Sequence, residues 1–379
     1  MSPDAKATGR VPLSRIDVDG ELRRAVSEVL DSGTFVRGPQ CRAFEAELRA
    51  WCGRRQVVLG ASGTSIAMLA LAAAGLGEGH EVLVPAHAPF ATVEAILRTG
   101  AEPVFVDVDE ATGTVDPADL AAGLTPRTQA IVAVHVAGHP CDMDAVLALA
   151  RDWALFVLED CTQAPGATYK GRLVGTLGHA GAFGFHPASN LPMLAEGGCI
   201  ATDGEGLADE VRRLRDHGRR RNGRRPARVG ENLRFEDEIQ AAIGRRSLRG
   251  LEAANERRRA VAARYSARLA DVPGIRLPVE REWARAVYSS YVIRCPDRDA
   301  LARTLEARGI EAAVQPSPPC HLEPAILEDS RLRRRPLPGT DRLFAEALSL
   351  PIFPGMDDLE VDAVGDAVAD HGARKARTG

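Results

Sequence analysis

The feature that most constrains the fold is a regular alternation of short apolar runs and helical patterns between about residues 55 and 205. The apolar runs predict strands over Glu81–Pro85, Pro103–Val108, Ala130–Val136 and Leu155–Glu159. The helical patterns cover Thr64–Leu76, Phe90–Thr99, Asp116–Ala122 and Met143–Trp153. Strands and helices that alternate at this spacing form a mostly parallel sheet, with crossover helices on both faces. We therefore expect an α/β fold.

The second half of the chain has a different pattern. Two more short strands are expected at Gly181–His186 and Gly198–Asp203, followed by a helix over Glu205–Asp216. A long amphipathic helix is expected over Glu236–Leu269. From Val272 to about residue 370 the pattern becomes strand–helix–strand. We predict an N-terminal arm and a large α/β domain over residues 1–250, and a small α+β domain over residues 251–379.

The amino-acid composition argues against several classes of protein. The chain has 48 basic and 52 acidic side chains, a formal net charge of −4, so nothing favours a nucleic-acid or membrane partner. The longest nearly apolar stretch, Ser65–Gly77, is shorter than the roughly 20 residues that a membrane span needs. The seven cysteines form no CxxC pair, which argues against a metal site or a disulfide framework. With no apolar leader at the start, the cytoplasm is the expected location.

Three segments carry residue types suited to ligand binding. Ser62, Gly63 and Thr64 lie in a small-residue turn that opens a helix, where backbone amides can face an anion. Phe90 follows a strand, in a loop where its ring could cover a flat heterocycle or pack in the core. Asp160 ends another strand, where ligands bind in parallel sheets or where it could cap the next element.

The basic segment Arg219–Arg225 has the sequence RRRNGRR. It is typical of a solvated surface turn. Clustered guanidinium groups could also contact an anionic group such as a substrate phosphate. Both interpretations stay open.

Taken in order, the motifs identify a family. They are SGTFVRGP (32–39), ASGTSIAMLAL (61–71), EVLVPAHAPFAT (81–92), FVLEDCTQAPGATYKGRLVGTLG (156–178), ENLRFEDEIQAAIG (231–244) and LSLPIFP (348–354). In this set the chain resembles the pyridoxal-phosphate (PLP)-dependent nucleotide-sugar aminotransferases of the DegT/DnrJ/EryC1/StrS group. The resemblance runs from about Pro12 to Ala369 and implies fold type I, with a seven-stranded type of sheet.

The resemblance also implies roles for single residues. Asp160 would pair with the pyridine nitrogen of the cofactor and keep it protonated, so that the ring acts as an electron sink. Gln163 would approach the ring hydroxyl, and Phe90 would stack on the ring face. The Ser62–Thr64 turn would hold the cofactor phosphate. Asn232 would reach the phosphate in a neighbouring subunit, which implies a homodimer with shared active sites.

One expected residue is missing. The family carries its Schiff-base lysine in an FxPxKN-like stretch, and this chain reads FHPASN there, with Ser189 at the lysine position. Only Lys6, Lys170 and Lys375 occur elsewhere in the chain. Serine cannot form an imine, so PLP or pyridoxamine phosphate (PMP) would be held without a covalent link. His186 is the nearest titratable candidate for a replacement base.

The expected function follows with its alternatives. The chain would bind PLP or PMP and act on an amino- or keto-sugar-like small molecule, in the manner of a nucleotide-sugar enzyme of secondary metabolism such as antibiotic biosynthesis. One alternative is an inactive pseudoenzyme that serves as a partner protein. Another is an aminotransferase with an engineered Lys-to-Ser change that traps the external aldimine. Gly184 stands where the family usually has a phosphate-binding serine.

Overall fold

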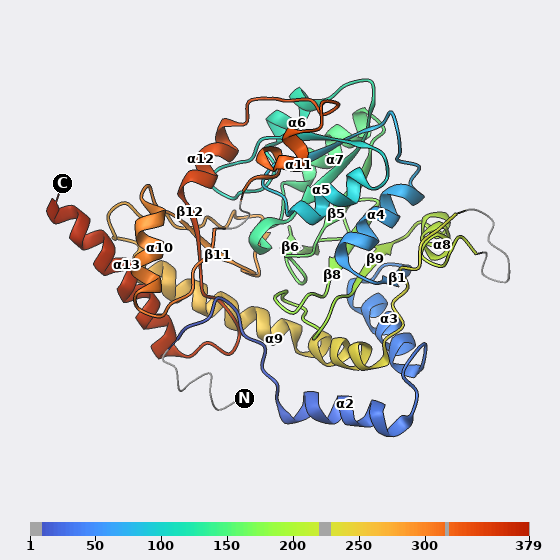
Figure 1. Ribbon diagram of the computed structural model, residues 1–379, viewed down its shortest axis with the longest axis horizontal. Helices are drawn as coiled ribbons and strands as arrows, with labels where there is room; N and C mark the ends of the chain where they lie inside the picture. The colour runs from blue at the N-terminus through green and yellow to red at the C-terminus, as the bar shows by residue number, and fades with distance from the viewer. Residues whose placement is uncertain (1–9, 220–228, 315–317, 379) are drawn as a thin grey trace.

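A seven-stranded sheet forms the centre of the molecule, shown in the ribbon view of Figure 1. The computed structural model describes residues 10–219, 229–314 and 318–378, with side chains up to residue 373. In sheet order the strands are β1 (Gln56–Gly60), β9 (Gly198–Thr202), β8 (Ala180–Gly184), β5 (Phe156–Asp160), β4 (Thr128–Val134), β2 (Glu81–Pro85) and β3 (Glu102–Val106). The neighbours from β8 to β3 are parallel, whereas β9 is antiparallel to β1 and β8. The mostly parallel α/β sheet expected from the sequence is confirmed.

Crossover helices cover both faces of the sheet because the side chains of a strand alternate. Val82 and Val84 belong to one apolar cluster, whereas Leu83 between them belongs to another. On the first face lie α4 (Gly63–Ala73), α5 (Phe90–Leu97) and α8 (Glu205–Leu214); on the second lie α6 (Pro117–Gly123) and α7 (Met143–Asp152). Burial on both faces explains why the strands appear in the sequence as continuous apolar runs.

The 32-residue helix α9 (Glu238–Leu269) connects two cores, as its path in Figure 1 shows. Leu248 and Leu251 pack near the β1 edge of the sheet, together with Phe44 of α3 (Pro39–Cys52). Further along, Tyr265 belongs to a separate cluster in the C-terminal part of the chain. The division proposed between residues 250 and 251 therefore falls inside one continuous helix that both units share.

The C-terminal unit is built around a two-stranded antiparallel sheet. Its strands are β11 (Tyr291–Arg294) and β12 (Ala347–Leu350). They pack with α10 (Arg298–Glu306), α12 (Pro338–Glu346) and α13 (Asp358–Thr378). The expected strand–helix–strand pattern is present here. A second small sheet joins, in order, β10 (Ala284–Arg285), β6 (Thr168–Tyr169) and β7 (Arg172–Leu173). It was not predicted, because two-residue strands are too short to show a period.

The remaining elements are short or lie at the N-terminal side. Helix α2 (Gly20–Ser32) begins after Asp19, whose carboxylate accepts a hydrogen bond from the backbone of Leu22, and it packs on α9. The short elements are η1 (Val136–Gly138), η2 (Cys320–Leu322) and α11 (Pro324–Leu327). Among the helices in the described ranges, none combines the length and the apolar character needed to cross a bilayer.

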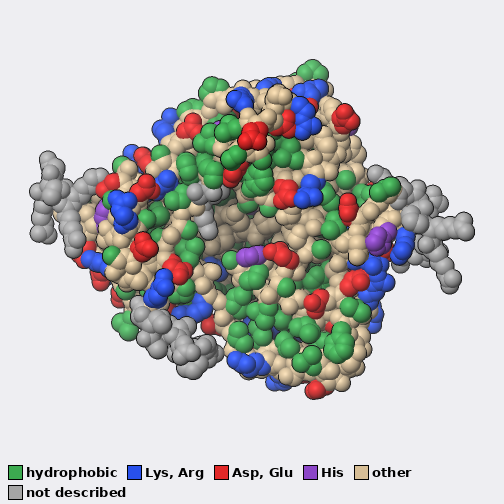
Figure 2. Space-filling view, viewed as in Figure 1, with side chains coloured by type: hydrophobic (Ala, Val, Ile, Leu, Met, Phe, Trp, Pro, Cys, Tyr) green, Lys and Arg blue, Asp and Glu red, His purple; other side chains and the backbone are tan. Residues whose placement is uncertain are grey.

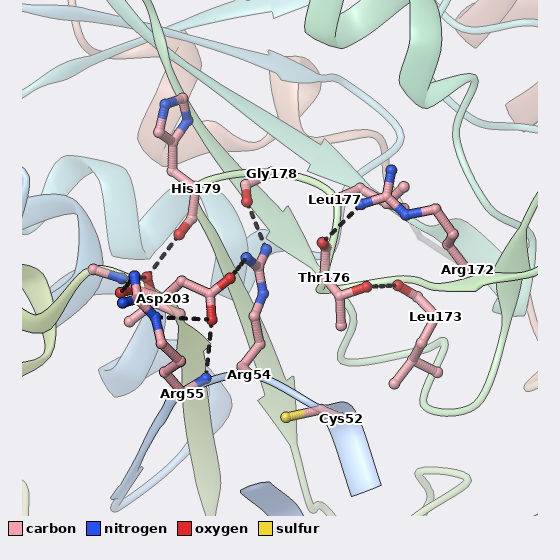
Figure 3. Close-up of polar contacts among 12 residues, drawn as sticks. Cys52, Arg54, Arg55, Arg172, Leu173, Thr176, Leu177, Gly178, His179 and Asp203 are labelled. Carbon is pink, nitrogen blue, oxygen red and sulfur yellow. Dashed lines mark hydrogen bonds and ion pairs between the residues drawn. The ribbon is translucent and has the colours of Figure 1, made fainter. Parts of the chain in front are cut away.

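Polar contacts fix the edge of the sheet beside the loop that joins β7 (Arg172–Leu173) to β8 (Figure 3). Arg54 donates 2.7 Å to the Asp203 carboxylate and 2.6 Å to the carbonyl of Gly178. The Thr202 hydroxyl donates 2.8 Å to the carbonyl of His179. These bonds tie the ends of β1 and β9 to the residues just before β8.

The same loop is held from inside by a fully buried carboxylate, Glu159 of β5. Its oxygens accept hydrogen bonds from the backbone amides of Gly175, Leu177 and Gly178 at 2.7–2.8 Å. His135 Nδ1 accepts 3.0 Å from the backbone of Cys141, so the neutral ring carries its proton on Nε2, 3.2 Å from Glu159. Burial raises the pKa of Glu159, but these donors outweigh it and hold the pKa below its usual value.

We predict that Glu159→Gln lowers the free energy of unfolding by about 3–5 kcal/mol, because it breaks a buried, fully bonded charge network. Urea denaturation measures this change. The matched control is Glu94→Gln, which removes a surface pair with Arg98 and is expected to cost less than about 0.5 kcal/mol.

The pH dependence gives a second measurement on the same variant. Because the folded-state pKa of Glu159 is lowered, its stabilisation is present above the ordinary carboxyl pKa of about 4.3 and is lost as pH falls through the folded value. The Gln variant should lack this part of the acid dependence. Unchanged stability at neutral pH would contradict the structural role given to Glu159.

Candidate functional site

A cavity of about 480 Å³ lies where the parallel strands end, between the large sheet and the C-terminal unit. Its walls come from the start of α4, the start of α5, the ends of β5 and β8, the turn after β8, β11–β12 and the segment at residues 13–14. Figure 2 shows a hollow near the middle of this face of the molecule. The carboxyl ends of parallel strands are where α/β folds bind ligands.

Asp160 is the buried anion of the cavity, with 3% of its surface exposed. Its Oδ1 accepts hydrogen bonds from the backbone N–H of Thr162 at 3.0 Å and from the Thr162 hydroxyl at 2.6 Å. Its Oδ2 accepts 2.5 Å from the hydroxyl of Thr92. A carboxylate held this way is oriented and only partly neutralised, so it can pair with a cationic N–H group of a ligand.

The turn before α4 forms another wall. Ser62 is the N-cap residue: its hydroxyl accepts from the backbone N–H of Ser65 at 3.1 Å and lies 2.8 Å from the Ser65 hydroxyl. Gly63 and Thr64 line the cavity, and the first amides of a helix lack partners within the helix. The backbone amides of Gly63 and Thr64 therefore lie where an anion can bind. The hydroxyl of Ser62 already caps the helix.

Gly63 lies against Gly184 of β8, and a side chain on either residue would crowd its neighbours. A Cβ on Gly63 would lie 3.1 Å from the Thr162 methyl group and 3.3 Å from Gly184 Cα. A Cβ on Gly184 would meet the same methyl group at 3.1 Å. The two glycines leave the backbone of α4 and β8 open to the cavity.

Gln163 lines the cavity beside a strained turn. Its Oε1 accepts a hydrogen bond of 2.7 Å from the backbone N–H of Ala137. Ala137 has φ of 54°, a left-handed conformation that is uncommon for a residue with a Cβ. Because the amide oxygen is engaged, the side chain can offer a ligand the N–H groups of its amide nitrogen.

Ser189 and His186 lie on the turn after β8, and both line the cavity. The Ser189 hydroxyl donates 3.2 Å to the carbonyl of Gly184 and accepts 3.1 Å from the backbone of Leu191. His186 Nδ1 accepts 3.1 Å from the backbone N–H of Ala188, so the neutral ring carries its proton on Nε2. That nitrogen lies 3.8 Å from the carboxylate of Glu196, which also lines the cavity.

Three predicted site residues lie apart from this lining: Ser62, whose capping role is described above, Phe90 and Asn232. Phe90 is the first residue of α5, where the predicted helix Phe90–Thr99 begins, and not in the loop also suggested for it; Pro89, just before it, has an extended ψ of 140°. Phe90 is 36% exposed, so it is not a core residue, and Pro89 and Ala91 line the cavity on either side of it. Asn232 is exposed on the loop before α9, bridged to Asp216.

The lysines of the chain are accounted for as far as the structure describes them. Lys170, in the β6–β7 turn, donates 2.6 Å to the carboxylate of Asp144 on the surface. Lys6 and the side chain of Lys375 lie outside the described residues, as do residues 220–225 of the basic segment. Among the described residues, the lining of the cavity contains no lysine.

Sequence reasoning missed Thr92, Thr162 and Ser289. The first two bond to Asp160, and the spacing of Asp160 and Thr162 is a local turn pattern that could have been read from the sequence. Ser289 lines the cavity with a buried hydroxyl that has no hydrogen-bond partner among the described residues. It comes from the C-terminal unit, more than 120 residues further along the chain, so only the tertiary fold brings it here.

A buried His135–Glu159–Cys161 group lies near this site, close enough together to hold a metal ion. The oxygens of Glu159 already accept three backbone hydrogen bonds, and His135 Nδ1 accepts another. These donors occupy the lone pairs that a metal would need. We therefore assign this cluster a structural role and not a metal-binding one.

Comparisons with known proteins agree on one family. The sequence pattern of the DegT/DnrJ/EryC1/StrS aminotransferase family matches residues 17–369. The erythromycin biosynthesis sensory transduction protein EryC1 of Saccharopolyspora erythraea is 41% identical over 350 residues, 92% of this chain and 94% of the relative. The dTDP-3-amino-3,4,6-trideoxy-alpha-D-glucose transaminase of Streptomyces venezuelae is 38% identical, with 97% of both chains covered.

A solved structure gives the same fold. The crystal structure of S. venezuelae DesV in complex with a ketimine intermediate superposes with a TM-score of 0.91 and 38% identity. The match covers 96% of this chain and 98% of that chain. The α/β fold is therefore that of the fold-type-I aminotransferases.

We predict that Thr92→Val destabilises the protein by about 1–3 kcal/mol, because it leaves one oxygen of a buried carboxylate without its donor. Thr304→Val is the matched control, since its hydroxyl bonds mainly to the carbonyl of Ala300 in its own helix. Thermal unfolding of the two variants measures the difference. Equal losses would show that the bond from Thr92 to Asp160 contributes nothing particular.

Proposed function

The chain belongs to the DegT/DnrJ/EryC1/StrS aminotransferase family, and we propose that it binds PLP or PMP without a covalent link and acts on a nucleotide-linked sugar. The observation that carries this proposal is the buried Asp160 carboxylate on the wall of the cavity. Two relatives, a dTDP-amino-sugar transaminase and DesV solved with a ketimine intermediate, support the substrate class and the cofactor.

The residues present fit the cofactor. Asp160 would accept a hydrogen bond from the protonated pyridine nitrogen, and Gln163 would donate to the ring hydroxyl. The amides of Gly63 and Thr64 would receive the phosphate at the start of α4, with Ser62 capping that turn. Phe90, next to two lining residues, would cover the ring face. When bound, the cofactor supplies an electron sink for breaking bonds at the amine-bearing carbon.

The non-covalent binding of the cofactor follows from Ser189. We propose that it occupies the position of the family's Schiff-base lysine. Its hydroxyl is held between the carbonyl of Gly184 and the backbone N–H of Leu191, and it cannot form an imine. The cofactor would then be held by hydrogen bonds and packing alone, and would exchange with free cofactor in solution.

Proton transfer in such a site needs another group, and we propose His186. In the neutral ring the basic lone pair is on Nδ1, which accepts from the backbone N–H of Ala188, so His186 must release Ala188 before it can take up a proton. The resulting cationic ring could then donate the Nε2 proton, and the Glu196 carboxylate, 3.8 Å from Nε2, would stabilise that cation. His186 and Glu196 are both largely exposed, so water can also exchange protons with the pair.

We also propose a homodimer in the cytoplasm, with Asn232 of each subunit reaching the other's cofactor phosphate. Asn232 is exposed, as that role requires. Large apolar side chains are exposed at Phe35, Val36 and Val229, as surfaces that a second subunit covers often are. All seven cysteines are free and buried, in keeping with a reducing compartment.

A second candidate function is an inactive partner protein. The absence of lysine from the described lining of the cavity favours it. The buried Asp160 carboxylate has hydrogen-bond donors but no ion pair among the described residues, which favours a bound cationic cofactor instead. The third alternative is an aminotransferase into which a serine was introduced at residue 189.

We predict that PMP binds saturably, as measured by the change in its absorption and fluorescence. Asp160→Asn should weaken binding by at least about 100-fold, because the cationic ring loses a buried counter-ion. Ser189→Ala should change the affinity by less than about threefold, because that hydroxyl bonds to the backbone. The surface variant Asp144→Asn is the control. A large loss in Ser189→Ala would show that Ser189 itself holds the ligand.

We predict that Ser189→Lys acquires a borohydride-reducible link to PLP, while Ser189→Arg, a cation that cannot form an imine, acquires none. Amino transfer from glutamate to a dTDP-keto-sugar then separates the alternatives. Our proposal expects no vigorous gain of transfer in Ser189→Lys. Vigorous turnover would support an aminotransferase with an introduced serine and would contradict lysine-free chemistry as the native function.

A further inference from the structure

A second cavity, of about 410 Å³, lies on the other side of the turn that carries Ser189. It is enclosed by the segment at residues 14–17, the start of α2, the turn at residues 187–194 and one side of α9. Ser14, Ala188 and Ser189 line both cavities. None of the roles proposed above uses the remaining lining.

Arginines dominate the α9 wall of this second cavity. Arg246, Gly250, Ala254 and Arg258 follow one another at intervals of four residues, so they form one row along the helix, and all four line the cavity. The small residues between the two arginines leave room beside the helix. The backbone positions of Arg246 and Arg258 lie about 18 Å apart along the axis. A ligand that contacts both must be larger than a single phosphate group.

Arg258 is the decisive residue, because it is buried without a compensating acid. It is 5% exposed, and its Nη1 donates to the carbonyls of Ile352 at 2.7 Å and Tyr288 at 3.5 Å. Its Nε is buried with no partner among the described residues. Burial lowers the pKa of Arg258 to about 10, so it is still charged at neutral pH. Buried charges in proteins are normally paired with an opposite charge.

The other arginines of this wall add positive charge. Arg246 is ion-paired with Asp19 through Nη2, yet its Nε is also buried without a partner in the described part of the chain. Arg249 lines the cavity on the next turn of α9, and the described residues include no ion pair to it. The Nε–H groups of Arg258 and Arg246 therefore have no partner among the described residues. Arg249 adds a third positive charge to the same cavity.

The acids of the cavity do not neutralise the buried charge. Asp17 and Glu21 line it, but both are exposed, where water screens their charges. Arg15, the remaining lining arginine, is already paired with Glu360 at 3.0 Å and lies over the ring of Phe353. The innermost part of the cavity is therefore positive.

We propose that the second cavity binds a phosphate-bearing small molecule of diphosphate size through Arg258, Arg246 and Arg249. Guanidinium groups bind phosphate oxygens with paired, charge-assisted hydrogen bonds, and a bound anion would satisfy both unpaired Nε–H groups. This site is separate from the start of α4 proposed for the cofactor phosphate. Its occupant would lie directly behind the turn that carries Ser189.

The test is calorimetric titration of the full chain with inorganic pyrophosphate, with and without saturating PMP. PMP fills the site at the start of α4. Pyrophosphate binding should persist in its presence, because the second cavity is a separate site. Arg258→Met should weaken it by about tenfold or more, and Arg249→Gln by about threefold. Arg151→Gln, on the exposed surface of α7 and outside both cavities, is the matched control and should bind like the parent.

Arg246→Gln keeps the test valid if Arg258→Met does not fold, which circular dichroism would show. Pyrophosphate binding that survives both Arg246→Gln and Arg249→Gln, or no binding at all, overturns the proposal. Titration with UDP and dTDP identifies the source of the phosphate: tighter binding than pyrophosphate indicates a nucleotide, and equal binding a free phosphorylated compound. If PMP fails to bind but pyrophosphate binds with the expected arginine dependence, only the proposed function fails.

Discussion

The arrangement of the site depends on one buried carboxylate, Glu159. It holds three backbone amides of the loop before β8 and the imidazole of His135, so it fixes that loop and the β4–β5 region to each other. The next residue, Asp160, points into the cavity, where two threonines orient it. Glu159 and Asp160 are adjacent in β5, but their side chains have different roles: Glu159 stabilises the fold, and Asp160 faces the cavity. The cost of burying two anions is offset only because each has several donors.

The cavity combines an anion, the N-terminus of a helix and a donor amide, which is the chemistry that a phosphorylated pyridine requires. What it lacks, among its described lining, is an amine. Ser189 bonds to the backbone on both sides, so it fits its turn without strain from an unpaired hydroxyl. If Ser189 occupies the lysine position of the family, as we propose, this fit explains how the fold and the rest of the site can be kept without a covalent anchor. The proposal thus separates cofactor binding from covalent attachment in this architecture.

Much of the fold could be predicted from the sequence, because strands buried on both faces are continuous apolar runs and the helices between them are periodic. Asp160, Gln163, Gly63 and Thr64 could be placed for the same reason, since each follows a predicted element. Phe90 was assigned both to a loop and to the start of a predicted helix, and the structure has the helix start, since a single residue at such a boundary is hard to assign from a pattern. Ser289 and the row of arginines on α9 could not be predicted, because only packing shows which charged side of a long helix faces a cavity.

The central claim is that the cofactor binds in this site without a covalent link. Native mass spectrometry of the protein loaded with PLP, followed by denaturing mass spectrometry after borohydride reduction, tests it directly. The account predicts a cofactor-sized mass increase in the native spectrum and no pyridoxyl adduct on the denatured chain. A reduced adduct on a lysine, or a native spectrum without the cofactor at saturating PLP, would contradict it.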